Sequence, residues 1–344
     1  MLTFFFEPFK MKKSGLYWFI LTSFLLFLGA CNYSDNGLPN IPAQKLPKVK
    51  LEIKRYGQAL FTLDTVHFKK ELTRLKRQFP YFLDADLNNP GNLHKLYSFV
   101  TDTQIIHIYH LTIKKFPNIT ILKKSLNNAF SHLKYYYPDY QLPHIYTYIS
   151  DLYYERPVIY KDSIIVIGLD NYLGSDFSYY LNLNIPFYRR RFMVPQEIPV
   201  DVMKAVYFHS FKKRSYSKTL LDNMIEAGKQ LYFLDAVLPN TPDSLKIGYS
   251  SSQLKWMQKH KKDVWAVLIR NQMLYSGRYI IINRMIKPGP FTEGFSRNSP
   301  PSMGTWFGWQ IVRAYMKKNS STDLPALFNN NDSQDILQKS EYKP

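Results

Sequence analysis

The chain has 344 residues, of which 45% are hydrophobic and 16% aromatic, so it can fill a sizeable core; disorder over most of its length is excluded. Its formal net charge of +19 favours acidic partners, such as anionic lipid headgroups, nucleic acid or acidic protein surfaces. The Lys and Arg residues are scattered in short clusters, a pattern typical of a solvated surface.

The chain begins with an export segment, which we place at residues 1–30. Lys12 and Lys13 form a basic region, and the apolar stretch 16–28 follows them. That stretch is too short to span a bilayer comfortably but has the length of a signal-peptide core. Met11 directly precedes the lysines, so we expect translation to start there.

Leu28, Gly29 and Ala30 directly precede Cys31, the only cysteine of the chain. Small residues before a cysteine at this place resemble a lipobox. The resemblance implies cleavage before Cys31, diacylglycerol on its sulfur and a palmitate-type acyl chain on its new amino group. Several acyl chains give lasting attachment, because each buried methylene adds ~0.8 kcal/mol. The polar residues 31–50 are expected to be a tether. We therefore expect a lipoprotein of the cell envelope that faces the periplasm and has no nucleic-acid partner.

Residues 51–344 are expected to form one domain, because we find neither a linker nor a membrane-spanning segment in them. Apolar side chains at helical spacing predict helices over residues 66–79, 101–116 and 119–137. Asn89-Pro90 predicts the start of another helix, since proline is favoured in the first turn.

The middle of the chain changes to short runs rich in Ile, Val and Tyr, at residues 144–149, 158–160 and 163–169. The last two runs flank Lys161-Asp162, which predicts a hairpin with a tight turn. Residues 182–198 are expected to be irregular.

Helices are predicted again over residues 199–212, 218–236, 252–275 and 301–317, with Ser217 as a cap of the second. Gly304 and Gly308 lie four apart in the last helix, which lets another backbone approach closely. We expect core packing there rather than a binding groove. The pattern as a whole predicts an α+β fold that is mainly α-helical.

Five segments and the ending carry a resemblance to a known family: His132–Pro138, Ser163–Gly174, Leu220–Phe233, Lys246–Tyr249, Met303–Asn319 and Lys339–Pro344. In their order and spacing the chain resembles the gliding-motility lipoprotein GldB family of Bacteroidota. The resemblance implies a membrane-anchored accessory or scaffold component of gliding motility and of the associated protein secretion machinery. Its implied partners are other envelope proteins of that machinery, and the membrane through the lipid anchor.

The family is also distantly similar to zinc metallopeptidases, which implies a zincin-like outline with a small central sheet. Those enzymes place HExxH on one helix and a glutamate ligand on the next. The corresponding helix here contains only His209, with Ala205 and Val206 in place of the first histidine and the catalytic glutamate. Glu226 matches the ligand of the following helix. We therefore expect His209 and Glu226 to be remnants of a metal site, in a pseudo-peptidase with no metal, no cofactor and no catalysis.

Two alternatives remain open. One is a zinc metallopeptidase with an altered ligand set, which would use His209, Glu226 and, as a further candidate, Asp222. The other is a basic module that binds acidic glycans or phospholipid.

Two weaker pairs complete the candidates. His107 and His110 lie three apart on a predicted helix and are a conceivable ligand pair, although helix histidines are more often structural. Asp170 and Asp176 follow the predicted hairpin and could bind a cation, although acidic residues are ordinary in turns.

Overall fold

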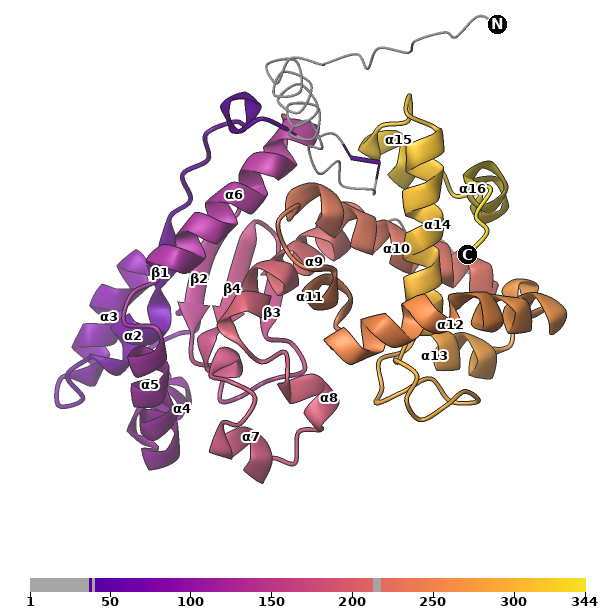
Figure 1. The fold of residues 1–344 in the computed structure, drawn as a ribbon. Helices are drawn as coiled ribbons and strands as arrows, with labels where there is room; N and C mark the ends of the chain where they lie inside the picture. The colour runs from indigo at the N-terminus through magenta and orange to yellow at the C-terminus, as the bar shows by residue number, and fades with distance from the viewer. Residues whose placement is uncertain (1–36, 39–40, 213–217) are drawn as a thin grey trace, which may run out of the picture.

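The computed structural model describes residues 37–38, 41–212 and 218–344 (Figure 1). It is mainly helical with one four-stranded mixed sheet, which confirms the predicted fold class. The predicted signal peptide, the lipobox and Cys31 lie outside the described residues, and the zincin-like outline stays a prediction. Leu38, within the expected tether, is buried against the main hydrophobic cluster. None of the helices in the described ranges is long and apolar enough to cross a membrane.

The sheet has the order β1-β2-β4-β3, with strands β1 (Ile53–Arg55), β2 (His144–Tyr148), β3 (Val158–Lys161) and β4 (Ile164–Gly168). The first three strands in this order are parallel, and β3 pairs antiparallel with β4 at the edge. The predicted hairpin is therefore confirmed. Its turn lies one residue later than expected, because Lys161 still pairs with Ile164. Asp162 takes the left-handed conformation, with φ 53°, that such a turn favours.

Helices cover both faces of the sheet. Since successive side chains of a strand point to opposite faces, each strand contributes to two hydrophobic clusters. Ile145 and Ile165 belong to the main cluster, whereas Tyr146 and Val166 pack in a second one. The helices of the N-terminal half are α2 (Tyr56–Phe61), α3 (Phe68–Gln78), α4 (Pro90–Thr101), α5 (Thr103–Lys115) and α6 (Thr120–Tyr136). Helices α2 to α4 cover the second face, and α6 lies on the other (Figure 1).

The helix predicted from residue 66 starts later than expected, at Phe68. Val66 is 84% exposed, because its backbone N–H is bound by the Asp64 carboxylate in a turn before the helix. The start of α4 is confirmed, since the Asn89 side chain accepts hydrogen bonds from the N–H groups of Gly91 and Asn92.

The middle and C-terminal part contains η2 (Leu169–Tyr172), α7 (Ser178–Asn182), α8 (Phe187–Arg190), η3 (Pro195–Glu197), α9 (Ile198–Ser210), α10 (Leu220–Val237), α11 (Asp243–Ile247), α12 (Ser251–Arg270), η4 (Met273–Tyr275), α13 (Tyr279–Ile286), α14 (Met303–Lys318), α15 (Leu324–Asn329) and α16 (Ser333–Ser340). The segment expected to be irregular thus holds the short helix α8. Ser217 lies outside the described residues, and the cap of α10 is Thr219, which forms a capping box with Asp222.

Helix α14 crosses α10 in the main core (Figure 1). A Cβ added to Gly308 would lie 1.7 Å from the carbonyl oxygen of Met224, and one on Gly228 would lie 2.3 Å from the Gly308 carbonyl. Gly304 meets α13 in the same way, at 2.8 Å from the Met285 oxygen. The predicted close approach at these glycines is therefore confirmed, and it packs the core.

Candidate functional site

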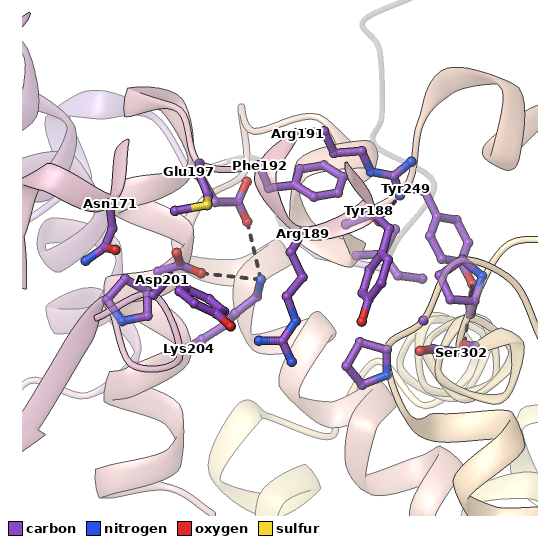
Figure 2. A pocket seen from close by; sticks show the side chains of 18 of the residues that line it. Asn171, Tyr188, Arg189, Arg191, Phe192, Glu197, Asp201, Lys204, Tyr249 and Ser302 are labelled. Carbon is purple, nitrogen blue, oxygen red and sulfur yellow. Dashed lines mark hydrogen bonds and ion pairs between the residues drawn. The ribbon is translucent and has the colours of Figure 1, made fainter. Parts of the chain in front are cut away.

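A cavity of about 250 Å³ lies where the start of α9 faces the loops after α11 and before α14 (Figure 2). A larger cavity of about 680 Å³, beside α6, is lined mainly by proline and apolar side chains. Binding sites combine apolar walls with a few convergent polar groups. The smaller cavity has both, because charged side chains from α8 and α9 meet aromatic rings in its walls. It is therefore the candidate site.

One wall of this cavity is a charged face of α9. Glu197 ends η3 and directly precedes α9, and Asp201 and Lys204 follow it four and seven residues later, so the three side chains share one side. The ammonium nitrogen of Lys204 lies 3.4 Å from Glu197 Oε1 and 3.7 Å from Asp201 Oδ1 (Figure 2). Tyr172, from η2 after strand β4, donates its hydroxyl to Asp201 Oδ2 at 2.8 Å. The sheet thus positions the tyrosine that holds Asp201.

Burial is the largest influence on the pKa values of Glu197 and Asp201. It raises the pKa of the Glu197 carboxyl to about 8, although the Lys204 ammonium opposes the shift. Burial also raises the pKa of Asp201, against the effects of Lys204 and of the hydrogen bond from Tyr172. For Lys204, burial lowers the pKa, but the two carboxylates raise it by more, so the amine stays protonated. Near neutral pH, Glu197 is therefore mostly neutral beside a cation.

The other walls come from α8 and from two loops that are distant in sequence. Arg189 projects between Lys204 and Tyr188 (Figure 2). Arg191 donates to the Gly248 carbonyl at 3.1 Å and to Gln253 Oε1 at 2.8 Å. Gly248 has φ +75°, a left-handed conformation that glycine adopts readily and that ends α11 here. These contacts join the residue after α8 to the end of α11 and to the first turn of α12.

The Glu197→Gln variant tests the protonation of the site. A raised carboxyl pKa means that the folded chain keeps a proton which the unfolded chain releases above its ordinary value of 4.5. The stability of the wild type should therefore fall as pH rises from 5 to 8, by at most about 1.4 kcal/mol per pH unit. The glutamine variant lacks this contribution and should show a flatter profile in urea denaturation at pH 5, 6, 7 and 8.

Glu52→Gln is the matched control, because Glu52 is exposed, and its profile should follow the wild type. Identical slopes for wild type and Glu197→Gln would contradict a buried carboxyl that is mostly neutral.

His209 and Glu226, the two predicted remnants of a metal site, make different contacts in the structure. His209 is exposed, and its ring stacks on Tyr160 of β3 at 3.9 Å. Glu226 of α10 accepts a hydrogen bond from the hydroxyl of Tyr207, two residues before His209 on α9. Neighbouring residues in a helix differ by about 100° in direction, so His209 points to nearly the opposite side from Tyr207. His209 and Glu226 therefore do not converge on one site.

The remaining candidates also have separate surroundings. His107 is exposed and pairs with the Tyr179 hydroxyl at 2.8 Å, and His110 is exposed on the same helix. Within residues 37–38, 41–212 and 218–344, no group of three His, Cys, Asp or Glu side chains could hold a metal ion. Asp222 is engaged in the capping box of α10.

The two aspartates after the hairpin do not form a pair. Asp170 is fully buried and accepts hydrogen bonds from the N–H groups of Ser150 and Leu152 and from the Ser150 hydroxyl. Asp176 has a side chain that is 89% exposed, 3.9 Å from Arg190. Asp170 therefore fixes the loop after β2, and the two side chains have different surroundings.

Sequence reasoning missed the Glu197–Asp201–Lys204 face. Glu197 lies in the stretch 182–198 that was expected to be irregular. The available signal was the spacing of two acids and a lysine along one helix face, directly after Pro195. The Glu197 carboxyl can exchange a proton near neutral pH, and the three side chains together can bind a polar ligand in the cavity.

The sequence model described as gliding motility protein GldB matches residues 39–344. Neither the curated proteins nor the solved structures gave a match to this chain. The match covers the sheet, the helices on both of its faces and the whole candidate site. The chain therefore belongs to the gliding motility protein GldB family.

Proposed function

We propose that this protein is a lipid-anchored, non-catalytic component of the gliding motility apparatus and its associated secretion machinery, where it holds other envelope proteins in place. The observation that carries the proposal is the family match over residues 39–344, which assigns the chain to gliding motility. Deleting the gene from a gliding host should abolish colony spreading, and the wild-type gene should restore it. Normal spreading and normal secretion by the deletion strain would refute the proposal.

The anchor is tested by Cys31→Ala. Without the thiol there is no site for the diacylglycerol, so the variant should leave the membrane fraction and fail to restore spreading. Membrane fractionation and a spreading assay measure both effects. Asn32→Gln, at the next residue, is the matched control and should behave as the wild type. A soluble Cys31→Ala protein that restores full spreading would contradict the need for an anchor.

The non-catalytic part is supported by the contacts of His209 and Glu226, which serve the packing of α9 against β3 and α10. Metal analysis of the purified full chain should therefore find no stoichiometric zinc. Zinc that is present at one equivalent, lost in His209→Ala and kept in the exposed-histidine control His94→Ala would revive the metallopeptidase alternative.

A further inference from the structure

The candidate cavity gathers buried polar atoms that lack hydrogen-bond partners. In the part of the chain that the structure describes, six buried side-chain atoms have none, and three belong to residues that line this cavity: Asn171 Oδ1, Arg191 Nε and Glu197 Oε2. Asn171 is 1% exposed and Glu197 is 4% exposed. Buried polar groups are nearly always paired. Their concentration around one cavity therefore indicates a ligand that both donates and accepts hydrogen bonds.

The charges of the cavity favour an anion. Arg191 is bound by two neutral oxygens, those of Gly248 and Gln253. Arg189 contacts the ring of Tyr154 at 5.9 Å, and no described carboxylate lies within ion-pair distance of it. The acids Glu197 and Asp201 face Lys204, and Glu197 is mostly neutral. The cavity is therefore net positive, which disfavours a cation and leaves the Arg189 guanidinium available to a carboxylate.

The remaining walls are aromatic and apolar. The rings of Tyr188, Phe192 and Tyr249 line the cavity together with Pro288 and Pro301. Figure 2 shows Tyr188 and Arg189 between the charged face of α9 and the side formed by Tyr249 and Ser302. The cavity volume of about 250 Å³ is far larger than the roughly 10–15 Å³ that one water requires. The space thus suits an organic ring rather than a single ion or water.

We propose that this cavity binds an acidic sugar. Sugar hydroxyls both donate and accept hydrogen bonds, so they can pair with the amide oxygen of Asn171 and the carboxyl of Glu197. The sugar carboxylate pairs with Arg189, and the apolar face of the ring packs on the aromatic wall. Inorganic phosphate would pair with Arg189 but would leave the aromatic wall uncovered. A neutral sugar would cover that wall but would leave the charge of Arg189 unpaired. This inference stands apart from the motility role.

Calorimetric titration of the full-length chain in detergent tests the site with three probes: D-glucuronate, D-glucose and inorganic phosphate. Glucuronate should bind, and the other two should bind at least roughly tenfold more weakly, because each lacks one of the two recognised features. Arg189→Ala should weaken glucuronate binding by roughly tenfold or more. Arg189 is exposed, so this substitution leaves the core unchanged.

Arg190→Ala is the matched control. Arg190 is the next residue, but it does not line the cavity, and it bonds to the Ser175 carbonyl. Its glucuronate affinity should equal that of the wild type. Tyr188→Ala, which removes a ring from the wall, should weaken glucuronate as well. The proposal is overturned if glucuronate produces no binding signal, if glucose or phosphate binds equally well, or if Arg189→Ala binds as the wild type does.

Discussion

Asp235→Asn is expected to lower the free energy of unfolding by about 3–5 kcal/mol, because it removes the carboxylate that pairs with the buried ammonium of Lys246. The Lys246 ammonium lies 2.9 Å from Asp235 Oδ1, and both side chains are at most 2% exposed. A buried charge without its partner is far more costly than an absent pair. Urea denaturation at neutral pH measures the loss.

Asp235 also organises the contact between α10 and α14. Its carboxylate accepts hydrogen bonds from Trp309 Nε1 at 2.8 Å and from two nitrogens of Arg313, at 2.7 and 2.8 Å. The Arg313 guanidinium lies 3.7 Å from the centre of the Trp309 ring. The Asp235 carboxylate thus joins three elements, α10, α11 and α14, so its loss should weaken the packing of all three in the main core.

Two further variants separate the buried charge from other effects. Asp243 bonds only the outer side of Arg313 and its side chain is 43% exposed, so Asp243→Asn should cost about 1 kcal/mol or less. The double variant Asp235→Asn/Lys246→Met removes the stranded cation and should recover part of the loss. If Asp235→Asn were no more costly than Asp243→Asn, the lysine would have to find water or another partner.

Local signals predicted much of this fold. Asn89 and Pro90 located the start of α4, because they act through the nearest backbone groups. The apolar spacing over residues 119–137 located α6 to within one residue at each end. The hairpin of β3 and β4 followed from the β-branched runs around Asp162. Val66 shows where apolar spacing fails as a predictor of helix ends. It continues the apolar spacing of α3, yet its backbone N–H is bound by Asp64 in a turn before the helix.

The candidate site was not predictable to the same degree. Its walls come from α8 and α9 and from the loops at Gly248 and Ser302, which the fold brings together from distant parts of the sequence. The pKa of Glu197 depends on burial, and burial is a property of the assembled structure. Conversely, His209 drew attention as a recognisable ligand type, yet its surroundings are an exposed ring contact with Tyr160. Residue type alone therefore drew attention to His209 rather than to the side chains that line the cavity.

Gly308→Ala is expected to lower the free energy of unfolding by about 3 kcal/mol or more, although alanine is the better helix former. Helix propensity alone would stabilise the variant by about 1 kcal/mol. The added methyl group, however, would lie 1.7 Å from the Met224 carbonyl oxygen, so α10 and α14 would have to move apart. The two effects have opposite signs, and urea denaturation decides between them.

Gly91→Ala is the matched control in an exposed helix. Its methyl group would meet only the side-chain oxygen of Asn89, at 3.2 Å, so its stability should stay within about 1 kcal/mol of the wild type. Gly228→Ala, on the opposite side of the crossing, should be as harmful as Gly308→Ala, because its methyl group would meet the Gly308 carbonyl at 2.3 Å. A stabilised Gly308→Ala would mean that the two helices cross at a greater distance, with room for a side chain between their backbones.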